Sequence, residues 1–209
     1  MNTPYVISSV RESDSAVRVE IVAPSGEVKR HRLTLKLWES LSHTRGDVIS
    51  AAEYERIREY SERCEAVTKA LRLLSDGMYS IRALTEKLTR SGFSKESAEA
   101  AVAVALKRGL IDEEAQAEII AEKQASRRHR GRGRVVRELV AKGYPTDVAK
   151  RGADSVPQSV YEEALEVSLM KKCRGTVPED KAERDRLTAS LVRLGFSAGE
   201  VIKEMNKLK

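Results

Sequence analysis

One stretch of the chain has a marked chemical character: the run Arg127-Arg128-His129-Arg130-Gly131-Arg132-Gly133-Arg134. An arginine guanidinium is a planar group that can hold a phosphate or a carboxylate through two parallel hydrogen bonds. Glycines between the arginines let the backbone approach a partner closely or donate its own N–H groups. The run therefore predicts a site for phosphate or carboxylate groups.

The charge of the chain is concentrated around this run. The formal net charge is +6, and the window from Lys123 to Lys142, with eight basic residues and one acid, alone carries +7. A second basic turn that contains a glycine follows at 171–175, where stacked repeats could bring both turns to one face. The residues that we expect to bind a partner or nucleic acid are Lys123, Arg127, Arg128, Arg130, Arg132, Arg134, Arg137, Lys142, Lys171, Lys172 and Arg174. The alternative is a solvated loop whose arginines contact only water and neighbouring glutamates.

The rest of the sequence carries no pattern typical of catalysis or metal binding. The three histidines are scattered, the two cysteines stand apart, and no P-loop, zinc-protease or dinucleotide-binding motif occurs. We therefore expect a protein that is not an enzyme, with no catalytic residue, metal site or cofactor. Tyr144 is the aromatic residue nearest to the basic run, and we expect it in the core, so base-specific readout is not expected.

The elements that must position the basic run belong to a repeat. The phrase Leu-x-x-x-Gly-aromatic occurs at 88–93, 139–144 and 191–196, with its glycines 51 and 52 residues apart. A helix that ends with a glycine in the left-handed conformation and an aromatic residue folded back on its last turn explains this phrase. We expect the next helices to be capped by Ser94, Thr146 and Ser197, and the first helix of the third repeat to be capped by Ser159.

The first third of the chain reads differently. Residues 17–22 alternate with period two, a turn follows at Ser25-Gly26, and residues 27–35 are again of the extended type, which predicts a hairpin with 5–10 as a possible third strand. A short helix is expected at 35–41, and Ser50 with Glu53 forms a capping box that opens a long helix to about residue 75.

These patterns predict a mainly α protein: three tandem three-helix repeats that form an elongated curved rod, with a small N-terminal β-hairpin or sheet. Apolar residues make up 41% of the chain but aromatic residues only 4%, which suits thin helical units with closely spaced helices. The expected division is an extension at 1–49, repeat one at 50–111, repeat two at 112–157 and repeat three at 158–209.

Several ordered segments resemble the RecX family, the bacterial regulators of the RecA recombinase: 70–80 with 84–88, Gly109-Leu110-Ile111-Asp112-Glu113, and 130–143. With the third repeat they cover about residues 66–209, whereas 1–49 lies outside the resemblance. Gln116 and Ile120 stand where family members often carry aromatic residues. The resemblance implies a modulator in the groove of the recombinase filament on DNA, which damps ATP hydrolysis, strand exchange and coprotease activity. It implies a place in DNA repair, recombination and the SOS response.

The expected partners are thus a RecA-type recombinase filament and DNA, contacted directly or through the filament. Two alternatives remain open: a regulatory protein that binds DNA alone, and a helical-repeat scaffold for acidic protein partners. Binding to naked DNA at physiological salt separates the first alternative from the filament hypothesis. No segment has the apolar length of a membrane span and the N-terminus lacks a signal-like pattern, so we expect a cytoplasmic monomer without membrane contact.

Overall fold

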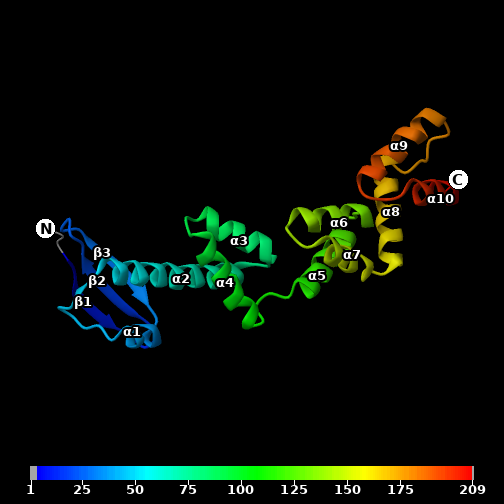
Figure 1. Cartoon of the computed structure of the whole chain (residues 1–209). Helices are drawn as coiled ribbons and strands as arrows, with labels where there is room; N and C mark the ends of the chain where they lie inside the picture. Colours follow the sequence, from blue (N-terminus) through cyan, green and yellow to red (C-terminus); the bar gives the residue numbers. More distant parts are fainter. Residues whose placement is uncertain (1–3, 209) are drawn as a thin grey trace. The chain divides into compact units, whose positions relative to one another are not determined.

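The computed structural model describes residues 4–208, which contain four strands and ten helices (Figure 1). The strands are β1 (Tyr5–Glu12), β2 (Val17–Val22), β3 (Val28–Leu33) and β4 (Val48–Ile49). The helices are α1 (Leu35–Leu41), α2 (Ala51–Asp76), α3 (Ile81–Arg90), α4 (Lys95–Lys107), α5 (Glu113–Ser126), α6 (Arg132–Ala141), α7 (Thr146–Asp154), α8 (Gln158–Cys173), α9 (Lys181–Arg193) and α10 (Ala198–Lys207). The predicted mainly helical fold with a small N-terminal sheet is confirmed.

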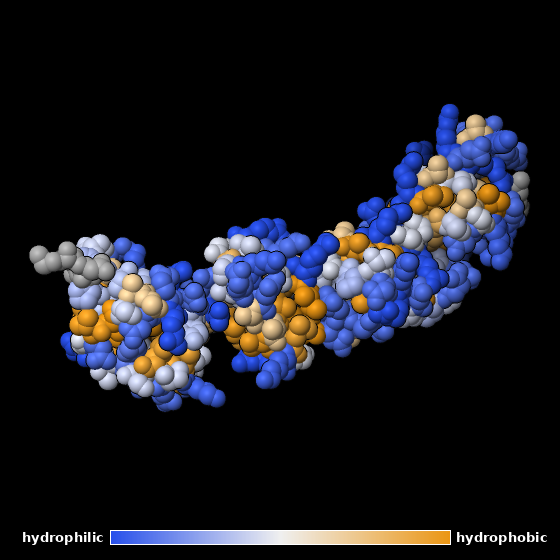
Figure 2. All heavy atoms as spheres, viewed as in Figure 1, coloured by the Kyte–Doolittle hydropathy of each residue, from blue (hydrophilic) through white to orange (hydrophobic). Residues whose placement is uncertain are grey.

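The chain separates into two compact units. The first unit contains the residues up to Gly77 together with Leu84–Leu110, and the second contains Met78–Ala83 together with the residues from Ile111 onward. Both units carry hydrophobic patches among a larger hydrophilic surface on the face drawn in Figure 2. The finer division at 49, 111 and 157 stays a prediction.

The sheet of the first unit is antiparallel, with strand order β3-β2-β1-β4. Alternation along β2 buries Val17, Val19 and Ile21 against α1 and α2, where they form one core with Trp38 and Ile57. The opposite face of β2 carries Arg18 and Glu20. The hairpin and third strand expected from the sequence are confirmed, and the two-residue strand β4 was too short to predict.

Helix α2 joins this sheet to the other helices of the first unit. Its first turn has the predicted capping box, in which Glu53 N donates to Ser50 Oγ at 3.2 Å and Ser50 N donates to Glu53 Oε2 at 2.7 Å. Ser61 anchors the edge strand, because its hydroxyl accepts a hydrogen bond of 2.9 Å from the backbone N of Arg32. Farther along, α2 packs on α4 through small buried side chains such as Ala70 and Ala101, which permit close approach.

The pH dependence of the first unit can be tested through His31. Its ring is buried in the core and lies edge-on to Tyr54, with centroids 5.5 Å apart. Burial lowers the pKa of His31, and the charge of Arg58 lowers it further. Because the unfolded chain then binds a proton that the folded chain does not, the free energy of unfolding should decrease as pH falls below about 6.5. Urea denaturation at pH 7.5 and 5.5 should show this loss, and His31→Phe should show a smaller one; equal losses would contradict the assignment.

The glycine of the repeated phrase has the predicted left-handed backbone in all three copies, with φ of +95° at Gly92, +95° at Gly143 and +101° at Gly195. The aromatic residue that follows closes each turn. Tyr144 N, for example, donates to Leu139 O at 3.2 Å, and its buried hydroxyl donates to Gln116 Oε1 at 3.0 Å. Tyr144 is therefore a core residue, as expected, and the buried Gln116 is its partner.

The predicted helix starts are right at Ser94 and Ser197 and wrong at Thr146 and Ser159. Ser94 Oγ accepts from Ser97 N, and Ser197 forms a capping box with Glu200. Helix α7 instead begins directly after Pro145, and α8 directly after Pro157, so Thr146 and Ser159 lie inside the first turns. The proline ring fixes a φ that suits the extended residue before a helix, which moves the start toward the proline.

Two hydrophobic cores support the second unit. Helices α5, α6 and α7 share one core, with Ala121, Leu139 and Ala149 fully buried and Tyr161 of α8 packed on it. Helices α8, α9 and α10 share the other, which includes Leu169, Leu191 and Met205. The basic run covers the connection between α5 and α6 and the first turn of α6, and the second basic turn lies at the end of α8.

Candidate partner and nucleic-acid interface

The basic run forms a tight connection rather than a long loop. Helix α5 ends at Ser126, Arg127 is its C-cap, and α6 begins at Arg132 with Gly131 as its N-cap. Within the turn, His129 has a left-handed backbone with φ of +48°, and Arg130 N donates to Gln124 O at 3.1 Å. The helical structure is thus interrupted at the arginines.

The two glycines of the run contact the chain itself. Gly131 N donates to Leu194 O at 2.9 Å, and Gly133 N donates to Gly195 O at 3.0 Å. A Cβ atom at Gly131 would lie 2.4 Å from the carbonyl carbon of Gly195, so only glycine permits this approach. The expectation that these glycines approach or donate to an external partner is therefore wrong, because the turn between α9 and α10 occupies them. Their role is to hold the arginine-containing connection against the turn between α9 and α10.

This docking brings the two predicted basic segments to one cavity of about 450 Å³. Arg128 and Arg130 line it from the α5–α6 connection, and Lys171 and Lys172 line it from the last turn of α8. The remaining lining residues are His129, Val167, Ser168 and Leu194. Ser168 Oγ fixes the wall through a hydrogen bond of 3.2 Å to His129 O. Because no acidic residue lines the cavity, it presents positive charge without internal neutralisation.

The predicted site residues differ in how free their charges are. Arg132 is ion-paired with Asp154, and Arg134 Nε contacts Glu138 Oε1 at 2.7 Å. Arg130 is half-buried, and its buried Nε has no hydrogen-bond partner among the described residues. Arg127 and Arg128 are exposed, with no carboxylate of the described chain within ion-pair distance. Free guanidinium groups of this kind can bind an anionic partner.

The other predicted residues lie outside this cavity. Lys123 is in the last turn of α5, Arg137 is exposed on α6, and Lys142 is the C-cap of α6. Arg174 has a left-handed φ of +53° and lines a neighbouring cavity of about 460 Å³, which Lys172 also lines. The cavity residues Val167 and Ser168 had no signal in the sequence beyond their place one turn before Lys171. The two cavities share Lys172, and the second is lined by Glu183 as well as by basic residues; we call their basic side chains the basic region.

The described residues contain no helix that is long and apolar enough to cross a membrane. Among the same residues, no group of three or more histidine, cysteine, aspartate or glutamate side chains is placed to hold a metal ion. Cys64 and Cys173 are free thiols. The basic region is thus the chemically distinctive part of the second unit.

Comparison with known proteins gives consistent matches. A family model described as the first three-helix domain of RecX matches residues 66–103. The regulatory protein RecX of Caldanaerobacter subterraneus subsp. tengcongensis is 28% identical over 161 residues, which are 77% of this chain and 79% of that protein. A crystal structure of a regulatory protein RecX shares the fold with a TM-score of 0.72 at 16% identity, over 94% of this chain and 96% of that one.

RecX from Lactobacillus salivarius shares the fold with a TM-score of 0.63 at 16% identity, over 70% of this chain and 96% of the solved one. A coverage of 94% in the first structure cannot be reached without most of residues 1–49, so the shared fold extends into the N-terminal sheet. The family model, the relative and the solved structures thus support the resemblance to the RecX family of regulatory proteins that the sequence suggested.

Proposed function

We propose that this protein binds the filament that a RecA-type recombinase forms on DNA and inhibits its ATP hydrolysis, strand exchange and coprotease activity. The observation that carries the proposal is the convergence of Arg128, Arg130, Lys171 and Lys172 on one cavity in a chain that resembles the RecX family. The side chains that line the cavity carry positive charge, so the cavity is complementary to an anionic surface such as a DNA backbone or an acidic patch of the recombinase.

Burial and docking favour a binding role for this cluster over a merely solvated loop. The connection is tied to the α9–α10 turn by two backbone hydrogen bonds and to α8 by the Ser168 hydroxyl. A loop fixed in this way holds its arginines in place, which lowers the conformational entropy lost on binding. Non-specific contacts to phosphates would need no base-stacking residues, and no Phe, Tyr or Trp lines the cavity.

The test is the rate of ATP hydrolysis by a RecA-type recombinase on single-stranded DNA, measured with increasing amounts of this protein. We expect the rate to fall to a low plateau at amounts of protein well below one per recombinase monomer, because an inhibitor of a filament acts on many subunits. An unchanged rate together with tight binding to naked DNA at physiological salt would support the alternative of a regulator that acts on DNA alone. An unchanged rate without DNA binding would support a scaffold for acidic proteins.

A further inference from the structure

A second basic surface lies in the first unit, on the face of the sheet that points away from α2. Antiparallel pairing places Arg11 of β1 opposite Arg18 of β2, and Arg18 opposite Arg32 of β3. Three arginines from three strands therefore stand in one row. Since neighbouring strands lie about 4.8 Å apart, the row spans roughly 10 Å.

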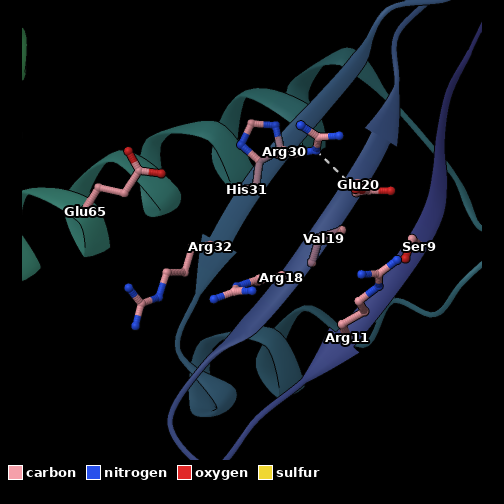
Figure 3. A pocket seen from close by; sticks show the side chains of 9 residues that line it. All are labelled: Ser9, Arg11, Arg18, Val19, Glu20, Arg30, His31, Arg32 and Glu65. Atoms are coloured by element: carbon pink, nitrogen blue, oxygen red, sulfur yellow. Dashed lines mark hydrogen bonds and ion pairs between the residues drawn. The ribbon is translucent and has the colours of Figure 1, made fainter.

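Figure 3 shows the side chains of this row at a cavity of about 440 Å³. In the next row, Arg30 Nε contacts Glu20 Oε1 at 3.2 Å, and this pair neutralises itself. Arg11, Arg18 and Arg32 are all exposed, and none has a carboxylate of the described chain within ion-pair distance. Glu65 of α2 also lines the cavity but forms no ion pair with these three arginines, so the row keeps three positive charges side by side.

This arrangement costs stability in the isolated protein. Like charges directly opposite one another on neighbouring strands repel and destabilise the pairing. The core on the other side of the sheet does not require arginine at these positions, because Val17, Val19 and Leu33 already fill it. A negatively charged partner would convert the repulsion into attraction.

We propose that this arginine row binds the sugar–phosphate backbone of single-stranded DNA independently of base sequence. A guanidinium can hold a phosphate through two hydrogen bonds, and three of them match a run of consecutive phosphates. The residues that line the cavity include no Phe, Tyr or Trp on which a base could stack, and the ring of His31 is buried. A protein partner would need a central apolar anchor, whereas the exposed apolar residues of this face, Val28 and Val48, stand in the row of Val6 and Val22, two rows away from the arginines.

A single strand fits the surface better than a duplex. The row is short and borders a recess, which a flexible strand can follow and a stiff double helix can touch only at its rim. The inference goes beyond the proposed function, because it concerns the other compact unit and requires no recombinase. It gives a role to residues 1–49, which the resemblance from sequence does not reach.

The experiment measures fluorescence anisotropy of a labelled 20-nucleotide oligo(dT) with the full chain and no recombinase, at several salt concentrations. Arg127→Glu, Arg128→Glu, Lys171→Glu and Lys172→Glu form the background, so that the basic cavity of the second unit does not contribute. In this background, Arg11→Gln with Arg18→Gln and Arg32→Gln should weaken binding at least ~10-fold at 50 mM salt. It should also flatten the plot of log affinity against log salt by about 2 units, since each lost phosphate contact removes about 0.7.

The matched control is Arg45→Gln with Arg56→Gln and Arg72→Gln, which removes the same charge from exposed, unpaired arginines of the same unit. The control should bind oligo(dT) within about twofold of the background protein, because distant exposed charges are screened by salt. Equal weakening in both triple variants would overturn the proposal, because the effect would then come from net charge. A 20-base-pair duplex that binds as tightly as oligo(dT) would overturn the preference for single strands.

Folding gives an independent readout. Removing the cross-strand repulsion should leave the thermal midpoint of the row variant equal to or above that of the background protein, while DNA binding falls. If the triple variant melts earlier, Arg18→Gln alone, at the centre of the row, replaces it with an expected weakening of about 3-fold or more. Unchanged affinity in that folded single variant would overturn the proposal. A negative result for the arginine row would not change the outcome of the recombinase ATPase test, so DNA binding by the sheet and inhibition of the filament are tested separately.

Discussion

A variant with Arg127→Glu, Arg128→Glu, Lys171→Glu and Lys172→Glu is expected to fold normally and to lose binding to the recombinase filament by at least ~100-fold. All four side chains are exposed, and none forms an ion pair with the described residues. The fold should therefore tolerate the change. Placing like charges across an interface costs several kcal/mol, and each 1.4 kcal/mol is a factor of ten in affinity.

The choice of these residues follows from the structure. A charge reversal of Arg132 would break its ion pair with Asp154, and Arg130 is half-buried, so changes at either position could act through stability. Filament binding is measured by anisotropy of labelled DNA within the filament, and helical content by circular dichroism. Full ATPase inhibition by the folded variant would remove the basic cavity from the mechanism.

A matched control variant distinguishes the effect of the position of the four residues from the effect of the change in net charge. Lys150→Glu with Lys181→Glu, Arg193→Glu and Lys203→Glu changes the same formal charge at exposed sites of the same unit that do not line the cavity. This control should inhibit nearly as well as the unmodified protein, with a modest loss from long-range electrostatics that disappears as salt increases. Equal loss in both variants would show that net charge alone drives the association.

Gly195→Ala is expected to destabilise the second unit by about 2–4 kcal/mol. The residue has φ of +101°, and a Cβ atom there would lie 2.2 Å from Arg134 N and 2.6 Å from Gly131 O. Backbone strain contributes roughly 1–3 kcal/mol, and a contact with rigid backbone adds a cost of similar size. Chemical denaturation followed by circular dichroism measures the change in the free energy of unfolding.

Gly175→Ala is the control for strain without contact. Gly175 lies in the same unit with φ of +89°, but an added Cβ atom there meets nothing within 4 Å. Its cost should be about 1 kcal/mol. The same loss at both positions would show that the docking of the α9–α10 turn on the basic connection is not as close as described. Gly195→Ala should also weaken filament binding while all basic residues remain, because it displaces the turn whose Leu194 lines the basic cavity.

The local structure of this protein could be read from the sequence. Each phrase of leucine, glycine and aromatic residue ends a helix, because the energetics of a left-handed glycine and its fold-back contact lie within six consecutive residues. Alternation placed the strands of the N-terminal sheet, and the Ser50 and Ser197 capping boxes placed two helix starts. The two missed starts follow prolines, where a fixed backbone angle competed with a side-chain cap.

The partners of the charged and glycine residues depended on tertiary structure. The sequence located the basic window, but whether a given arginine is paired, as Arg132 is with Asp154, depends on how α6 packs against α7. The sequence suggested that the glycines of the window bind a ligand, but they pack against Gly195, about 60 residues away. Which backbone segments come close to each other is decided only by the tertiary structure.

The arginine row of the sheet depended on tertiary structure even more. Arg11, Arg18 and Arg32 are unremarkable as separate residues, and their meeting depends on strand register and on a bulge between Ile7 and Ser9. A shift of one residue in one strand would turn its arginine toward the core, since successive side chains point to opposite faces. Composition and periodicity thus fix which residues are charged and which segments are helical or extended. Long-range packing decides which charges meet.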